Sequence, residues 1–140
     1  MLRSLKTLGV RLRQQEANAK LICEALKANP HVTDVFYVGD PDHPDYALSK
    51  RQTTGFGAMI SFKTDTHQRA LDTLERTRLI LFAESLGGTE SLVTYPLVQT
   101  HGAIPAPMLD KLGIDDRLLR LSVGIEDAED LLADLDQALA

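Results

Sequence analysis

The stretch Leu118-Leu119-Arg120-Leu121-Ser122-Val123-Gly124-Ile125-Glu126 decides how the rest of the chain is interpreted. Its first six residues are typical of a buried β-strand, apart from the arginine in the middle. The Arg120 guanidinium does not lose its proton, so burying it requires a carboxylate, a phosphate or several carbonyls. No acidic residue lies within the strand itself. The residues alone leave two partners open, namely a distant carboxylate of the fold or the anion of a ligand.

Length, composition and charge describe one ordinary globular domain. Of the 140 residues, 44% are hydrophobic and 25% are charged, as in folded rather than disordered proteins. A domain of this length buries about two-thirds of its unfolded surface. The net charge of -5 argues against a nucleic acid or an anionic membrane as the main partner.

The single cysteine and the N-terminal residues indicate the cellular compartment of the protein. Cys23 is the single cysteine of the chain and lies within a helical pattern, so we expect a core residue in a reducing compartment. Met1 to Arg13 contains four basic residues and no long apolar run, unlike a signal peptide or a membrane span. We therefore expect a cytoplasmic location. His31, His43 and His67 lack the spacing of metal ligands, so no metal site is predicted.

Helical periodicity is strongest near the two ends of the chain. One apolar seam, interrupted only by Gln15, predicts a long N-terminal helix over Ser4 to Lys27 that Asn29-Pro30 ends. Its members are Leu5, Leu8, Leu12, Ala19, Ile22 and Leu26. A second seam, made of Leu131, Leu132, Leu135 and Leu139, predicts a C-terminal helix with acidic residues on its first turn. Shorter helical segments are predicted at Tyr46 to Lys50, from Asp65 or Thr66 to near Thr77, and at Ala106 to Leu112.

Five β-rich runs alternate with these helices. They are Val32 to Val38, Phe56 to Phe62, Leu79 to Phe82, Ser91 to Thr94 and Leu118 to Val123. Within the second run, Ala58-Met59-Ile60 indicates a strand covered on both faces. Several connections are too short for parallel crossovers, so we predict an α/β (α+β) fold in which helices cover a small mixed or antiparallel sheet. Such an architecture does not by itself identify a function.

Several segments in a fixed order carry a resemblance. Glu84-Ser85-Leu86-Gly87-Gly88 comes first, followed by Thr100-His101 and then by Leu119 to Glu126. Other matching segments are Leu5-Lys6-Thr7-Leu8, Gly39 to Pro44, Glu129-Asp130-Leu131 and Asp134 to Leu139. Together they resemble the C-terminal part of the Cys/Met-metabolism family of pyridoxal-phosphate enzymes. That family contains cystathionine γ-synthase, cystathionine β- and γ-lyases and methionine γ-lyase, and the resemblance covers essentially the whole chain.

The resemblance implies which domain of the family's enzymes this chain corresponds to, and which cofactor-binding residues it lacks. Residues 1–140 would form a single small C-terminal domain, like that of fold-type I pyridoxal-phosphate enzymes, without the large cofactor-binding domain. The family's cofactor lysine, in a Ser-x-Thr-Lys context, would lie before residue 1. Its phosphate-binding glycines, ring-stacking aromatic residue and pyridine-binding aspartate have no counterparts here. We therefore expect no catalytic, cofactor-binding or metal-binding residue in this chain, and no pyridoxal phosphate bound to it alone.

The resemblance also implies four substrate-binding residues. Arg120 would hold the α-carboxylate of an amino-acid substrate, and Ser85 would help to place that carboxylate. Glu84 would influence selection at the distal end of the substrate, and Thr100 would line the pocket. From the residues alone, Arg120 could instead form an internal ion pair, Ser85 could be a turn residue and Glu84 a solvated acid. We assign no proton transfer to His101, because the family's lysine performs it.

Three functions follow as hypotheses. The first is the substrate-binding part of a pyridoxal-phosphate-dependent lyase or transferase of sulfur amino acids, inactive alone. The second is a stand-alone amino-acid-binding module, and the third is a structural or assembly fragment. The expected partners are a sulfur amino acid, through the complete enzyme, and further copies of the chain, but no nucleic acid or membrane. In the isolated domain the Arg120 guanidinium should be exposed or held by a local acid.

Overall fold

A computed structural model describes residues 2–140 of the protein. The helices are α1 (Leu2–Leu5), α2 (Leu8–Ala28), α3 (Tyr46–Gln52), α4 (His67–Arg76), α5 (Pro96–Gln99), α6 (Ala106–Leu112) and α7 (Ala128–Leu139). The strands are β1 (Val32–Phe36), β2 (Met59–Thr64), β3 (Leu81–Phe82), β4 (Leu92–Thr94) and β5 (Leu118–Ser122). They form one sheet in the order β1-β2-β5-β4-β3, antiparallel except for the parallel pair β3 and β4. This mixed sheet confirms the predicted fold class.

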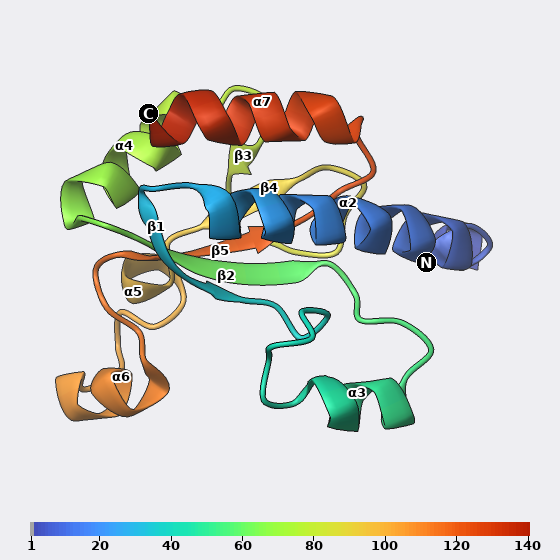
Figure 1. Ribbon diagram of the computed structural model, residues 1–140, viewed down its shortest axis with the longest axis horizontal. Helices are drawn as coiled ribbons and strands as arrows, with labels where there is room; N and C mark the ends of the chain where they lie inside the picture. Colours follow the sequence, from blue (N-terminus) through green and yellow to red (C-terminus); the bar gives the residue numbers. More distant parts are fainter. Residues whose placement is uncertain (1) are drawn as a thin grey trace.

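The helices are distributed unequally over the two faces of the sheet (Figure 1). The three longest, α2, α4 and α7, lie together on one face, which we call the helical face. The short helices α5 and α6 lie on the other side, which we call the open face. None of the described helices combines the length and apolar character needed to cross a membrane.

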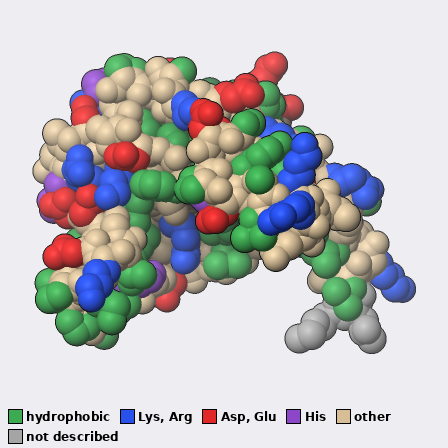
Figure 2. Space-filling view, turned by 60° about the horizontal axis from the view of Figure 1, so that its bottom comes forward, with side chains coloured by type: hydrophobic (Ala, Val, Ile, Leu, Met, Phe, Trp, Pro, Cys, Tyr) green, Lys and Arg blue, Asp and Glu red, His purple; other side chains and the backbone are tan. Residues whose placement is uncertain are grey.

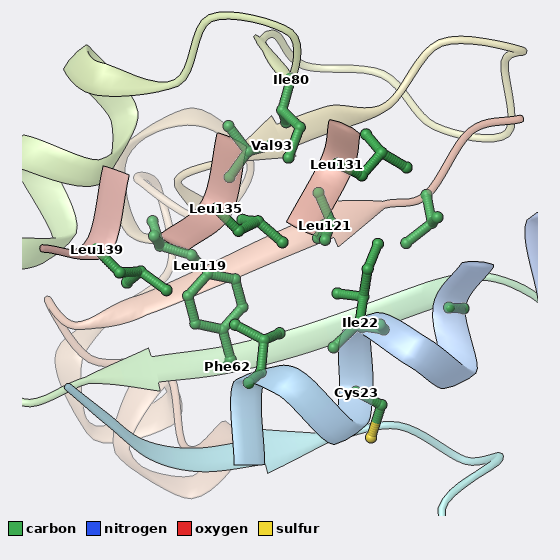
Figure 3. Close-up of a cluster of buried hydrophobic side chains, with 14 of the residues drawn as sticks. Ile22, Cys23, Phe62, Ile80, Val93, Leu119, Leu121, Leu131, Leu135 and Leu139 are labelled. Atoms are coloured by element: carbon green, nitrogen blue, oxygen red, sulfur yellow. The ribbon is translucent and has the colours of Figure 1, made fainter. Parts of the chain in front are cut away.

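The hydrophobic core fills the space between the helical face of the sheet and the helices that cover it (Figure 3). Phe62 from β2 and Leu119 from β5 are fully buried there, against Ile22 of α2 and Leu135 of α7. Because side chains alternate along a strand, each core residue of β5 is followed by one on the open face. Cys23 belongs to this core, as predicted, and its burial raises the pKa of the thiol. The core thus fixes which strand residues are available to a site.

The N-terminal helix is real but shorter than predicted. A break at Lys6 and Thr7 separates α1 from α2. The carbonyl of Ser4 accepts the Thr7 hydroxyl at 3.3 Å and the Arg11 guanidinium at 2.9 Å, and such side-chain contacts compete with the helical ladder. The apolar seam is buried only from Ala19 onward, since three of its leucines are exposed. These are Leu5, Leu8 and Leu12.

Strand β2 differs from its prediction at both its start and its surroundings. It begins at Met59 rather than Phe56, because Gly57 takes a left-handed φ of +69° that ends the extended backbone before it. Phe56 instead stacks on Tyr46 of α3, with ring centroids 4.9 Å apart. The expectation that both faces are covered was wrong, since Met59 is 36% exposed on the open face.

The predicted strand Leu79 to Phe82 is reduced to the two residues of β3. The cause is Asp134 of α7, whose buried carboxylate accepts the backbone N–H groups of Arg78, Leu79 and Ile80, at 2.9 Å each. These three amides point toward one side-chain group, so they cannot take part in a strand ladder. The same contacts attach α7 to the connection between α4 and β3.

Candidate carboxylate-binding site

The register of the central strands places Arg120 in a row of polar residues across the open face. Ser61 of β2 and Thr94 of β4 lie opposite Arg120 on its two sides. Residues paired in this way share a face of the sheet, and the neighbours of Arg120 in β5, Leu119 and Leu121, are buried on the helical face. The side chain of Arg120 therefore projects from the open face, away from the core.

The Arg120 guanidinium has few partners of its own. Its Nη2 donates to the Thr94 hydroxyl over a long 3.5 Å, and its Nε is buried without a hydrogen-bond partner among the described residues. No described acidic side chain forms an ion pair with it. The expectation of an exposed or acid-paired guanidinium was therefore wrong, because the side chain is half-buried and unpaired. Buried donors rarely lack an acceptor, which points to a ligand.

A cavity of about 340 Å³ opens beside Arg120, which is large enough for an amino acid. Polar and basic groups on its wall come from Arg120, Ser61, Lys63 and His101. The remaining wall is mostly apolar and consists of Phe36, Pro96, Leu112, Gly113, Ile114 and Leu118. Figure 2 brings this underside forward and shows basic side chains in a hollow bordered by hydrophobic ones. The site thus combines a cationic group with an apolar enclosure.

The second cation of the cavity is already neutralised. Lys63 Nζ lies 2.8 Å from an Asp115 carboxylate oxygen, which also accepts from Arg117 at 3.1 Å. Burial alone would raise the pKa of Asp115, but hydrogen bonds from Lys63 and Arg117 hold it below its ordinary value. Asp115 therefore stays ionised and keeps Lys63 occupied, which leaves Arg120 as the unpaired cation of the cavity wall.

The Glu84–Gly88 segment is attached to the same row of residues. The Thr94 hydroxyl donates to the Ala83 carbonyl at 3.0 Å, so one threonine contacts both Arg120 and the start of this segment. The Gly87 amide donates to the Ser122 hydroxyl at 2.9 Å, and Gly87 has a left-handed φ of +74°. Between these attachments Glu84 and Ser85 are exposed. The structure brings their backbone close to the Arg120 row but shows no direct hydrogen bond between them and Arg120.

Thr100 and His101 follow the short helix α5. His101 lines the cavity, while the Thr100 hydroxyl lies 2.6 Å from the imidazole Nδ1 of His101 and does not itself form part of the wall. Thr100 is thus placed to orient His101. Sequence reasoning passed over His101 as a wall residue and missed Ser61 and Thr94. The signal for these two is their register with Arg120, which a single sequence does not reveal.

The wall of this cavity has no lysine amine free to attach pyridoxal phosphate, the cofactor that the resemblance implies. Its covalent attachment requires a free lysine amine. Lys63 is the one lysine on the cavity wall, and its ammonium group is held by Asp115. What the cavity does offer is a guanidinium with an unused donor, which is suited to a carboxylate.

Comparisons with known proteins identify relatives of this chain. The chain is 49% identical to cystathionine gamma-lyase of Dictyostelium discoideum over 139 residues, which cover 99% of this chain and 36% of the relative. A crystal structure of cystathionine gamma synthase from Xanthomonas oryzae pv. oryzae in complex with cystathionine matches with a TM-score of 0.94. Its sequence identity is 45%, and the match covers 99% of this chain and 36% of that one.

A more distant structure shows the same fold. It is a putative O-acetylhomoserine (thiol)-lyase from Campylobacter jejuni containing a pyridoxyl-lysine phosphate, with a TM-score of 0.94 at 31% identity. The match covers 99% of this chain and 33% of that one. The chain therefore spans about a third of the length of the relatives it matches. The family model for Cys/Met metabolism PLP-dependent enzymes matches residues 1–140, so this chain belongs to that family.

Proposed function

We propose that this chain is the C-terminal, substrate-carboxylate-binding part of a pyridoxal-phosphate-dependent lyase or transferase of sulfur amino-acid metabolism. The observation that carries the proposal is the Arg120 guanidinium, whose buried Nε lacks a partner beside an amino-acid-sized cavity. A planar guanidinium binds both oxygens of a carboxylate at once, so an α-carboxylate would supply the missing acceptor. The solved relative that carries cystathionine supports a sulfur amino acid as this ligand.

The other proposed site residues act around this contact. Ser85 and Glu84 are exposed on the segment that Thr94 attaches to the Arg120 row, so both are accessible to a ligand. We propose that Ser85 hydrogen-bonds the substrate carboxylate and that Glu84 faces its distal end. Thr100 acts through His101, whose imidazole it holds at the cavity wall.

The Arg120 contact predicts binding that depends on a carboxylate. Titrating the chain with L-cystathionine should shift the NMR resonance of the Arg120 side-chain Nε–H, because this donor gains an acceptor. Arg120→Ala should abolish binding, and Arg120→Lys should weaken it about tenfold or more, because an ammonium group lacks the planar fork. L-methioninamide, which has no carboxylate, should bind far more weakly than L-methionine.

The matched control removes an arginine elsewhere. Arg76 lies on α4, over the helical face, and pairs with Asp72 at 3.5 Å. Arg76→Ala changes the net charge by the same amount and should leave the affinity unchanged. An affinity that is equal in Arg120→Ala and in the unmodified chain would contradict the proposed role of Arg120.

We further propose that the chain has no activity by itself, since the cavity provides no free lysine amine. Incubating it with pyridoxal phosphate and L-cystathionine should produce no 2-oxo acid, as measured by a coupled dehydrogenase assay. Formation of a 2-oxo acid that Arg120→Ala abolishes would overturn this proposal. Cytoplasmic location and assembly with further copies of the chain stay predictions.

A further inference from the structure

Helix α2 buries two amide side chains beside its apolar residues. Gln15 is 3% exposed and donates to the Gly88 carbonyl at 2.7 Å. Asn18 is 1% exposed and donates to the carbonyls of Gly124, at 3.2 Å, and Glu126, at 2.8 Å. A helix packing only for stability would place apolar residues here, because burying an amide is favourable only when its hydrogen bonds are made. Both amides are instead used to hold two loops.

The two loops are also joined directly to each other. The Glu126 carboxylate accepts the Ser91 amide at 2.6 Å and the Ser91 hydroxyl at 2.9 Å. The same hydroxyl oxygen accepts the Gly124 amide at 2.8 Å, and the Ile125 amide donates to the Thr89 carbonyl at 2.8 Å. We call Gln15, Asn18, Ser91 and Glu126 the loop clasp.

Gly124 shows how closely the loops approach. A Cβ added to Gly124 would collide with the Thr89 carbonyl oxygen and would lie 2.7 Å from the Glu90 carbonyl carbon. Both atoms belong to the backbone of the neighbouring loop, so no side-chain movement could make room. The contact requires glycine, and it fixes residues 88–91 against the end of β5.

We propose that the loop clasp is a positioning device for the Glu84–Gly88 segment and, through it, for the exposed Ser85. Thr94 attaches Ala83, the residue before the segment, to the open face, and Ser122 attaches Gly87 within it. Its exit at Gly88 is set by Gln15, and the next residues are set by Ser91 and Glu126. Without the clasp the exit would move, and the turn would lose its fixed distance from the guanidinium. The part that concerns ligand affinity rests on the proposed function.

The test uses Asn18→Asp, which preserves the shape of the side chain but removes both donated hydrogen bonds. Two quantities are measured at a temperature where the variant keeps the ellipticity of the unmodified chain. The first is hydrogen exchange of the Gly87 amide, which should become faster because its contact with Ser122 loosens. The second is the affinity for L-cystathionine, which should fall about tenfold, since binding groups must be held within about 0.5 Å.

The control is Thr64→Ala, which removes a buried hydroxyl that donates to the Thr66 carbonyl at 2.8 Å beside the start of β5, the end of that strand opposite to Ser122. It should lower stability while leaving both Gly87 exchange and affinity unchanged. Ser91→Ala, which removes one hydroxyl from the clasp, should act like Asn18→Asp. Unchanged Gly87 exchange in both clasp variants would overturn the inference, as would equally fast exchange in Thr64→Ala. If neither the unmodified chain nor any variant binds cystathionine, the proposed function fails. The Gly87 exchange rates still decide the role of the clasp in that case.

Discussion

Phe62→Ala is expected to lower the free energy of unfolding by about 3–5 kcal/mol. Phe62 is fully buried in β2, where its ring lies between α2 and α7 at the centre of the core. Removing the ring forfeits its transfer free energy and leaves a cavity that the surrounding helices and strands cannot fill by small shifts. Domains of this size are stabilised by only about 5–15 kcal/mol, so the loss is a large fraction of the total.

A matched control is available on the same sheet. Phe82 of β3 is 51% exposed, so Phe82→Ala should cost less than about 1 kcal/mol. Urea denaturation followed by circular dichroism measures the stability of both variants. The midpoint of Phe62→Ala is expected well below those of Phe82→Ala and the unmodified chain. Similar midpoints for the two alanine variants would contradict the core described for β2.

The second large effect is expected at Asp134. Asp134 is 6% exposed, and its carboxylate accepts three backbone N–H groups that have no other acceptor among residues 2–140. Asp134→Asn replaces one acceptor oxygen by an amide donor that faces these donors, so at least one N–H is left unsatisfied. We expect a loss of about 1.5–3 kcal/mol at neutral pH, the usual range for hydrogen bonds to a charged group.

This contribution should depend on pH in a defined direction. Burial alone would raise the pKa of Asp134, but the three N–H groups hold it below its ordinary value. A carboxyl group whose folded pKa is lowered stabilises the protein fully above its unfolded pKa of about 3.9. The stabilisation is lost as the pH falls through the folded value. The gap in unfolding free energy between the unmodified chain and Asp134→Asn should therefore be constant near neutrality and narrow below about pH 4.

Denaturant midpoints at several pH values would measure this gap. Asp72→Asn is a suitable reference, because Asp72 makes only an ion pair with Arg76 at 3.5 Å and a contact with Gln68 on the surface of α4. Its unfolding free energy should stay within about 0.5 kcal/mol of the unmodified chain at neutral pH. A gap for Asp134→Asn that widens on acidification would contradict the assignment of the three hydrogen bonds to the ionised carboxylate.

The sequence predicted the elements whose signals are local. An apolar run around Arg120 indicated β5, and the leucine spacing after Asp127 indicated α7, which the Asp127 carboxylate caps by accepting the Glu129 amide at 2.9 Å. Helix α6 spans Ala106 to Leu112 as predicted, and Gly113 ends it with a left-handed φ of +69°. Each of these depends on residues within a turn or two of one another, so a single sequence contains the information.

Most of the features that sequence reasoning missed around the candidate site are long-range. Asp134 lies 54 residues after Ile80, so nothing near Leu79 shows that a distant carboxylate will occupy its amides. Likewise, Thr94 becomes a neighbour of Arg120 only through the register of β4 with β5. Gln15 was noticed only as an interruption of an apolar seam, and its purpose becomes visible once Gly88 lies 2.7 Å away. The candidate site was therefore predictable in its central arginine but not in the residues around it.

The two edges of the sheet have a consequence for the behaviour of the chain in concentrated solution. Exposed strand edges are templates for the addition of further strands, which is a common start of aggregation. At one edge β3 offers only two residues, and at the other the pairing of β1 with β2 shifts register between Val32 and Asp34. A short strand and an irregular strand both offer few free backbone N–H and C=O groups in an unbroken row. This sheet is thus protected at both edges against the growth of intermolecular fibres.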